Sequence, residues 1–271
     1  CPFCGTPLIL DKAQMKSVIT PSAVAPFKIP QKDAINSFHV WMKKLWWLPS
    51  KTKEYARPNK MQGLYVPYWT YDSNTSTSYS GQRGDDYQIT ETYTEGGQTK
   101  TRTVTKTRWT NVSGHVYVPF DDVLVVGSTS LPQKHVYALE PWHLNDLLPY
   151  TKEFLSGFKS ESYEVDVKNG FEKAKSIMDV EIVNAIRRDI GGDHQRITSK
   201  NVSYNNVTFK HILLPIWLSS YRFKDKVYRF VVNGQTGKVK GERPYSALKI
   251  ALAVLLVIAI IIAIVYFIQG S

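Results

Sequence analysis

The sequence contains few cysteines, and both stand at its start. Cys1 and Cys4 are the two cysteines among 271 residues, which excludes a fold stabilised by many disulfides. Acidic side chains are also scarce, with 23 Asp and Glu against 34 Lys and Arg, so the formal net charge is +11. Apolar residues make up 43% and charged residues 21% of the chain, which excludes a mostly disordered or fibrous protein. We therefore expect one or two folded domains.

Common catalytic motifs are missing as well. Residues 234–239 resemble a phosphate-binding loop, but they lack the four-residue gap between glycines and the hydroxyl residue after the lysine. Ser156 and Lys159 form an SxxK pattern without the partner motifs that its chemistry requires. No HExxH or GxSxG pattern occurs, and the glycines before Asp193 and His194 are explained by a helix end. We expect no enzymatic activity.

The longest apolar run lies near the end of the chain. Residues 250–268 are nineteen residues without a charge, and fourteen of them are Ile, Leu, Val or Phe. A helix rises about 1.5 Å per residue, so this segment would span roughly 28 Å, close to the hydrocarbon thickness of a bilayer. Its β-branched residues do not oppose a helix in lipid, where the backbone must satisfy its own hydrogen bonds. We predict one transmembrane helix over residues 247–269 rather than a buried core helix.

Charges before this run predict its orientation. In the segment of residues 224–249, the basic residues are Lys224, Lys226, Arg229, Lys238, Lys240, Arg243 and Lys249, and the acidic ones are Asp225 and Glu242. By the positive-inside rule, the N-terminal bulk of the chain is cytoplasmic, and the protein crosses the cell membrane once. Near the membrane surface, Lys238, Lys240, Arg243 and Lys249 are expected to bind anionic headgroups.

Four sequons oppose this orientation, because Asn-X-Ser/Thr is a glycan acceptor in a secreted chain. They begin at Asn74, Asn111, Asn201 and Asn206. These residue types are also common in turns and at strand ends, so we give the charge asymmetry and the free cysteine pair more weight.

The two cysteines form a CPxCG knuckle at residues 1–5. Two thiolates at this spacing can hold one tetrahedral zinc ion, and the glycine permits the turn around the metal. A structural zinc site needs four ligands, and the six histidines show no spacing that supplies the other two. We therefore expect an upstream CxxC pair to complete a zinc ribbon, in which Cys1 and Cys4 are metal ligands. A redox CxxC is the alternative, although Pro7 and an apolar run follow it in place of a helix start.

The body of the chain carries mixed helix and strand patterns. Residues 1–15 form the partial knuckle, residues 16–30 contain three prolines and are predicted to be an extended linker, and residues 31–246 form an α+β domain. Helix patterns follow Pro30 and Asn169, and strand patterns fill much of the remainder. We predict a mainly antiparallel sheet with flanking helices.

The first helix pattern contains a tryptophan cluster. Trp41, Trp46 and Trp47 lie beside Lys43 and Lys44. Packing in a core is the favoured interpretation. A helix face that lies on lipid or on a partner is the alternative.

A long hairpin can be predicted in detail from Gly96 and Gly97. With these two residues as the turn, residue 91 faces residue 102 and residue 85 faces residue 108. The ribbon carries four basic residues that resemble a phosphate-binding stripe: Lys100, Arg102, Lys106 and Arg108. In this register Glu91 faces Arg102 and Asp85 faces Arg108, which neutralises part of the stripe. We favour a solvated ribbon with cross-strand ion pairs, with nucleic acid or anionic lipid binding as the alternative.

Five segments resemble a group of bacterial membrane proteins with an N-terminal zinc ribbon and a hydrophobic C-terminus. They are residues 1–5 (CPFCG), 63–72 (GLYVPYWTYD), 79–84 (YSGQRG), 187–193 (RRDIGGD) and 237–244 (GKVKGERP). The resemblance covers most of the chain and implies a zinc ribbon, a membrane anchor and the company of membrane-stress proteins of the phage-shock type. Some members are labelled primosomal replication-restart helicase through the ribbon. This chain has no nucleotide-binding loop and lacks the first CxxC of the group.

These patterns predict a membrane-anchored cytoplasmic interaction or adaptor protein. A zinc ribbon would be its docking module for an unidentified protein partner, and the basic segment before the anchor would lie on anionic lipid. A nucleic-acid-binding protein tethered to the membrane is the alternative, and salt-dependent retention of nucleic acid would favour it.

Overall fold

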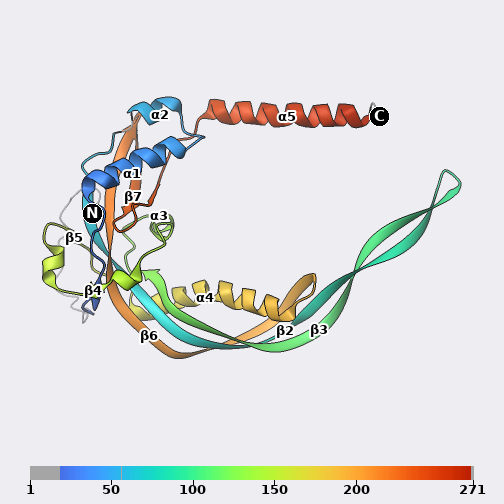
Figure 1. The fold of residues 1–271 in the computed structure, drawn as a ribbon, viewed down its shortest axis with the longest axis horizontal. Coiled ribbons are helices and arrows are strands. Elements are labelled where there is room, and N and C mark those ends of the chain that lie inside the picture. Colours follow the sequence, from blue (N-terminus) through green and yellow to red (C-terminus); the bar gives the residue numbers. More distant parts are fainter. Residues whose placement is uncertain (1–18, 56, 270–271) are drawn as a thin grey trace. The chain divides into compact units, whose positions relative to one another are not determined.

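The structure is a computed structural model that describes residues 19–55 and 57–269. Helices and strands both contribute, as Figure 1 shows. The described helices are α1 (Gln31–Lys44), α2 (Ser50–Tyr55), α3 (Gln133–Tyr137), α4 (Val167–Ile190) and α5 (Ala247–Gln269), with 3-10 turns at Leu144–Asp146 and Lys152–Leu155. The described strands are β1 (Ala23–Val24), β2 (Gln62–Glu95), β3 (Gln98–Val126), β4 (Leu148–Pro149), β5 (Lys159–Ser160), β6 (His194–Phe223), β7 (Lys226–Asn233) and β8 (Val239–Gly241).

The strands form one mostly antiparallel sheet, which confirms the predicted fold class. Its order is β3-β2-β6-β1-β4, with β5 beside β2, β7 beside β6, and β8 beside β7. The pairs β6–β7, β7–β8 and β1–β4 are antiparallel, whereas the short strands β1 and β5 pair in parallel with β6 and β2. The zinc ribbon stays a prediction, because the knuckle lies outside the described residues.

The chain divides into two compact units. Unit 1 consists of residues 1–68, 126–164 and 211–271, and unit 2 consists of residues 69–125 and 165–210. The long strands β2 and β6 belong in part to each unit.

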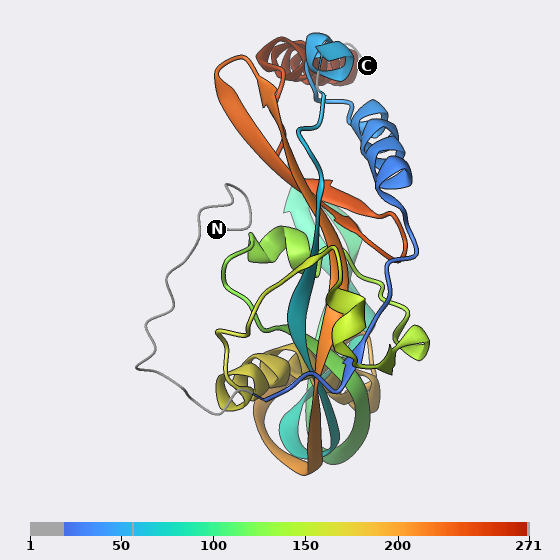
Figure 2. The same cartoon turned by 90° about the vertical axis from the view of Figure 1, so that its left-hand side faces the viewer.

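In unit 1, α1 covers the strands β7 and β8, as Figure 2 shows. Ala34, Phe38 and Met42 recur every four residues and are all buried, so one stripe of the helix faces the sheet. The Phe38 ring stacks on Phe230 with their centroids 4.2 Å apart. Burial of these side chains fixes α1 against β7.

In unit 2, α4 is held by its ends and by one apolar face. Its N-cap is Asp166, whose carboxylate accepts a hydrogen bond from the backbone N–H of Asn169, so the helix begins two residues before the predicted start. Gly191 ends it with a positive φ, as predicted. The buried face contains Ala174, Met178, Ile182, Ile186 and Ile190.

The hairpin of β2 and β3 keeps the register that its glycine turn predicts. Hydrogen bonds join side chains that this register places opposite each other along much of the ribbon. The contacting pairs are Arg102 with Glu91, Thr107 with Asp86, Gln82 with Asn111, and Thr75 with the carbonyl of Val118. The local turn therefore determines pairings far from itself.

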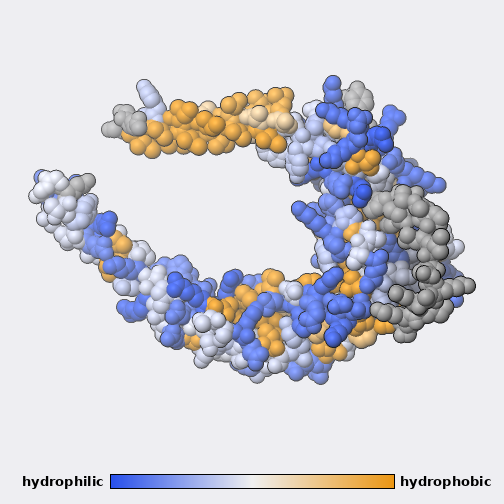
Figure 3. All heavy atoms as spheres, turned by 180° about the vertical axis from the view of Figure 1, so that it is seen from behind, coloured by the Kyte–Doolittle hydropathy of each residue, from blue (hydrophilic) through white to orange (hydrophobic). Residues whose placement is uncertain are grey.

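The helix α5 carries the predicted apolar run. Over Ala247–Ile268 it is long and apolar enough to span a membrane, and none of its most apolar window is buried. Figure 3 shows hydrophobic residues along its length. The Ser246 hydroxyl accepts a hydrogen bond from the Lys249 backbone N–H at 3.3 Å, which caps the helix start.

Candidate membrane-surface basic site

Strand β8 positions the basic residues that precede α5. Its backbone pairs with β7, where Val231 lies opposite Lys240 and Phe230 lies opposite Gly241. A Cβ at Gly241 would lie 2.4 Å from the Cβ of Phe230, so this close approach requires glycine. Side chains alternate along a strand, so Val239 is buried while Lys240 is partly exposed.

A cavity of about 620 Å³ opens beside this strand in unit 1. Basic and aromatic side chains from several elements line it: Lys134 of α3, Lys226 and Tyr228 of β7, Lys240 of β8, and Arg243 and Tyr245 from the segment before α5. We call this group the basic pocket. Its aromatic rings offer flat contact surfaces, and its cations can donate to phosphate oxygens.

The charges of the basic pocket are not balanced internally. Glu242 is the one carboxylate among its described lining residues, and it accepts a hydrogen bond from the Arg229 backbone N–H at 3.1 Å. No ion pair among the described residues joins the four pocket cations to a carboxylate. Arg243 instead lies 5.3 Å from the ring centroid of Tyr245, and its hydrogen bond and charge lower the pKa of that phenol. An anion is therefore the ligand that this arrangement suits.

His135 also lines the basic pocket. Burial lowers the pKa of this imidazole, and the charges of Lys134 and Lys240 lower it further against an opposing effect of Glu242. The ring is therefore mainly neutral at neutral pH.

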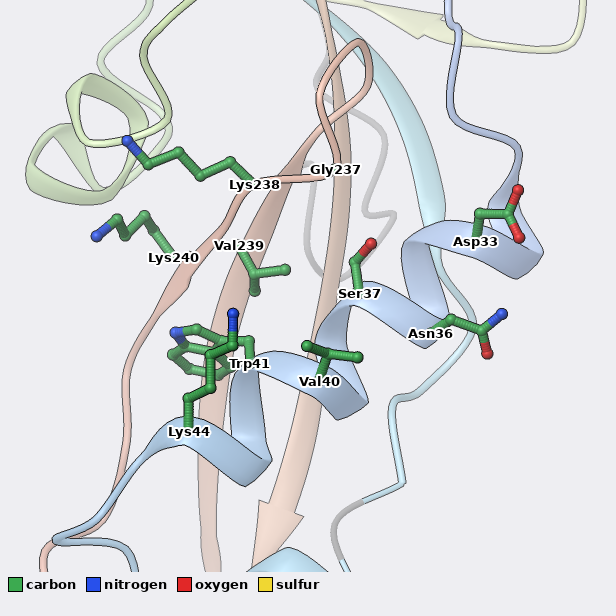
Figure 4. A pocket seen from close by; sticks show the side chains of 10 residues that line it. All are labelled: Asp33, Asn36, Ser37, Val40, Trp41, Lys44, Gly237, Lys238, Val239 and Lys240. Atoms are coloured by element: carbon green, nitrogen blue, oxygen red, sulfur yellow. The ribbon is translucent and has the colours of Figure 1, made fainter.

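A shallow groove of about 520 Å³ adjoins this region between α1 and β8, as Figure 4 shows. Trp41 and Lys240 line both the groove and the basic pocket. Lys44 and Lys238 are its other cations, and Asp33 is its carboxylate. The groove adds further positive charge beside the basic pocket.

The four basic residues predicted for the membrane surface do not all meet in one place. Lys240 and Arg243 line the basic pocket, and Lys238 lines the adjoining groove, where its ammonium donates to the Glu140 carbonyl. Lys249 donates to backbone carbonyls of the segment between α1 and α2. Cys1 and Cys4, the predicted zinc ligands, lie outside the described residues.

Lys134 is the pocket cation that sequence reasoning missed. It lies on a five-residue helix, α3, that has too few residues to show a periodic pattern. Lys226 was counted in the basic segment, but its placement with Tyr228 in the pocket depends on the β7–β8 pairing. No local sequence signal brings these elements together.

The basic stripe of the hairpin in unit 2 is partly neutralised, as predicted. Glu91 accepts from Lys106 at 2.9 Å and from Arg102 at 3.3 Å, and these contacts lower the pKa of its carboxyl group. Asp85 pairs with Arg83 at 2.8 Å, and Arg108 lies 5.2 Å from the ring centroid of Tyr87. The predicted pairing of Asp85 with Arg108 was therefore wrong, because nearer partners satisfy both groups.

Three carboxylates gather elsewhere in unit 2. Ligand atoms of Asp72, Asp121 and Asp122 lie within 4.8 Å of one another. Lys210 places its ammonium 3.2 Å from Asp122 and 3.9 Å from Asp72, and Thr208 donates to Asp72 at 2.8 Å. This internal cation offsets part of the negative charge of the cluster. Extension of the hairpin register would have placed residue 72 opposite residue 121.

The Asp193 and His194 pair is part of a hydrogen-bond network. His194 lies 3.1 Å from Asp86, which also accepts from the Thr107 hydroxyl at 2.6 Å. Asp193 accepts from the backbone N–H of Asp86 at 2.8 Å. The Thr107 hydroxyl therefore donates to the carboxylate of Asp86 and not to the His194 ring. An activated hydroxyl nucleophile would instead donate to an imidazole.

Comparison with known proteins adds one relative. The chain is 27% identical over 249 residues to a Bacillus subtilis protein called Uncharacterized protein YdjG, an alignment that covers 91% of this chain and 70% of YdjG. No family model matches the chain. No solved structure matches it either.

Proposed function

We propose that this protein is a membrane-anchored interaction protein whose basic pocket binds the phosphate groups of anionic lipids. The observation that carries the proposal is the position of the pocket in the chain. Arg243 and Tyr245 line the pocket, and the apolar helix α5 begins two residues later, at Ala247. A bilayer that receives α5 would therefore bring its headgroups to the level of these side chains.

The proposed orientation is cytoplasmic for the residues that precede α5. The support comes from the excess of basic over acidic residues between positions 224 and 249. Anionic lipids of the cytoplasmic leaflet would then supply the negative charge that the basic pocket lacks.

The proposed docking module is a zinc ribbon completed by Cys1 and Cys4. Two thiolates in a CxxC spacing would provide half of a tetrahedral zinc site, and an upstream pair would provide the rest. Its partner would be a protein, so the chain would act as an adaptor, and we propose the membrane-stress response as the context of that role. Affinity capture of the full-length protein from cross-linked membranes would test this part, with a Cys1→Ser and Cys4→Ser variant as the control.

Lipid binding can be tested on the purified full chain in detergent. Native mass spectrometry would compare retention of phosphatidylglycerol with that of phosphatidylcholine. A variant with Lys134→Gln, Lys240→Gln and Arg243→Gln should lose selective retention. Each cation near a membrane surface contributes about 1 kcal/mol, so removal of three lowers affinity by a factor of about 100.

A matched control removes the same charge from unit 2. The variant with Lys100→Gln, Lys106→Gln and Arg108→Gln should retain phosphatidylglycerol like the unmodified chain, because these residues lie on the hairpin rather than in the basic pocket. Equal losses in both triple variants, or equal retention of the two lipids by the unmodified chain, would contradict the proposal.

Nucleic acid binding is the second candidate function. The hairpin interleaves cations with Tyr87 and Tyr93, over which Arg108 and Arg102 lie at 5.2 and 5.6 Å from the ring centroids. Single-stranded nucleic acid is bound by such combinations of charge and aromatic rings. The hairpin triple variant should then lose salt-dependent retention of an oligonucleotide, whereas the pocket triple variant should keep it.

A further inference from the structure

The segment between α1 and α2 presents tryptophans outward and leucines inward. Trp46 is 74% exposed and Trp47 is 38% exposed, while Leu45 and Leu48 are buried in the core of unit 1. The favoured sequence interpretation, that these tryptophans pack in the core, is therefore wrong for Trp46 and Trp47, whereas Trp41 packs against the core of unit 1. Exposure of these aromatic rings leaves apolar area in water that a contact surface would bury.

This segment is joined to the first turn of α5. The Ser246 backbone N–H donates to the Trp47 carbonyl at 2.8 Å. The Lys249 ammonium donates to the carbonyls of Trp46 at 3.0 Å and of Leu48 at 2.9 Å. Three hydrogen bonds thus fix the backbone of the two tryptophans at the level where α5 begins.

Lys249 also contacts the exposed ring itself. Its ammonium lies 5.9 Å from the centroid of the Trp46 ring, within range of a cation–π interaction. The apolar run starts at the next residue, Ile250. In a bilayer that accommodates residues 250–268, Lys249 and the Trp46 ring would lie at the boundary between headgroups and acyl chains.

Tryptophan is the residue type that suits this boundary. Its ring buries apolar area while the indole N–H stays hydrogen-bonded to water or lipid, and membrane proteins are enriched in it at both interfaces. Lys44, which is exposed at the end of α1, adds a positive charge close to the same segment. Geometry and residue type therefore agree on a lipid surface as the contact.

We infer that residues 45–48 form a second membrane contact, in which Trp46 and Trp47 enter the interfacial layer beside α5. This inference rests on the proposed membrane anchoring, and it adds an anchor that would fix the orientation of unit 1 on the lipid surface. A transmembrane helix alone leaves an attached domain free to tilt relative to the bilayer surface. A second contact, joined to α5 by the Lys249 hydrogen bonds, restricts that tilt.

The seven tryptophans of the chain make a direct test possible, because none of them lies in α5. The full chain would be reconstituted in vesicles of phosphatidylcholine and phosphatidylglycerol that are brominated near the start of the acyl chains. Bromine quenches only indole rings that reach that depth. The unmodified chain should be quenched relative to its emission in unbrominated vesicles.

Two variants assign the quenched emission. Trp46→Phe keeps an aromatic ring at an exposed position, so the fold is retained. This variant should lose the part of the quenchable emission that comes from Trp46 and keep the part that comes from Trp47. Trp142→Phe removes a buried tryptophan and should leave the quenched component unchanged. Equal quenching of Trp46→Phe and the unmodified chain would overturn the inference.

Washing the same vesicles with alkaline carbonate separates the two proposals. A chain that is washed off is not inserted, which overturns both the membrane anchoring and the second contact. A chain that stays in the vesicles without quenching at Trp46 overturns the second contact alone. If quenching is absent and the tryptophan emission instead shifts to the blue as the protein concentration rises, Trp46 would be assigned to an interface between two copies of this chain.

Discussion

Both units carry clustered positive charge, but they differ in how far nearby carboxylates neutralise it. In unit 2, Glu91 binds Arg102 and Lys106 across the hairpin. In unit 1, the cations and aromatic rings of the basic pocket line a cavity of about 620 Å³, and Glu242 is the one carboxylate among its described lining residues. Basic residues in a sequence therefore do not by themselves define a binding surface. The position of the nearest carboxylate decides whether the charge remains available to a ligand.

The largest expected effect is a loss of stability when the core of unit 1 beneath the basic pocket is disrupted. Phe38→Ala should lower the free energy of unfolding by about 3–5 kcal/mol, because it removes a buried ring stacked on Phe230 and leaves a cavity. Trp41, on the next turn of α1, lines the pocket, so lipid retention should fall as well. Denaturant unfolding of the full chain in detergent would measure the change. Val40→Ala, at an exposed position on the same helix, should have little effect.

Acidification should destabilise the two units at different pH values. Burial, opposed by a hydrogen bond to the Ile19 carbonyl, lowers the pKa of His211 in unit 1. Neutral His211 therefore stabilises the fold above its unfolded pKa of about 6.5, and this contribution is lost as the pH falls below that value toward the lowered folded pKa.

In unit 2, burial raises the pKa of Asp72, but hydrogen bonds from Asp122 and Thr208 and the charge of Lys210 outweigh it and lower the pKa overall. The stabilisation from ionised Asp72 persists at pH values above the unfolded pKa of about 3.9 and is lost as the pH falls through the folded pKa. Unit 1 should therefore lose stability at a higher pH than unit 2.

Hydrogen exchange of peptides from each unit, measured across this pH range, checks the order. His211→Asn should remove the loss of protection that unit 1 shows at the higher pH, and it should leave the exchange of unit 2 unchanged. Simultaneous loss of protection in both units, unaffected by the substitution, would count against the assignment.

A smaller effect, on the affinity of the hairpin for a polyanion, is expected when the carboxylate that neutralises its cations is removed. Glu91→Gln removes the carboxylate that binds Arg102 and Lys106, so the affinity of the hairpin for a polyanion should rise a few-fold, as expected for exposed ion pairs worth up to about 1 kcal/mol. Binding of heparin or an oligonucleotide at low salt would measure it. Glu172→Gln, on α4 of the same unit, is the matched control. No increase for Glu91→Gln would show that the hairpin charge is not limited by this carboxylate.

The parts of the fold that could be predicted from sequence are those with local causes. The apolar run from Ile250 predicted α5, and Gly96 with Gly97 predicted a register that holds as far as Thr75. The first helix pattern was less informative, because apolar residues continue to Leu48, directly before Pro49, whereas α1 ends at Lys44 and Leu45 adopts an extended backbone.

The candidate site was less predictable because tertiary contacts assemble it. Lys134 reaches the basic pocket from a short helix, and Lys240 reaches it through the pairing of β8 with β7. The contacts of Lys249 also depend on tertiary structure, since its sequence position beside the apolar run did not reveal the carbonyls that it binds.

Cysteine accessibility in intact cells tests the central claim, that α5 fastens a cytoplasmic body to the membrane. Asp225→Cys places one thiol in the exposed turn between β6 and β7, in a chain where Cys1 and Cys4 are replaced by serine. A membrane-impermeant maleimide should fail to label this thiol until the cells are opened, and the protein should resist extraction by alkaline carbonate. Labelling of intact cells, or release of the protein by carbonate, would contradict it.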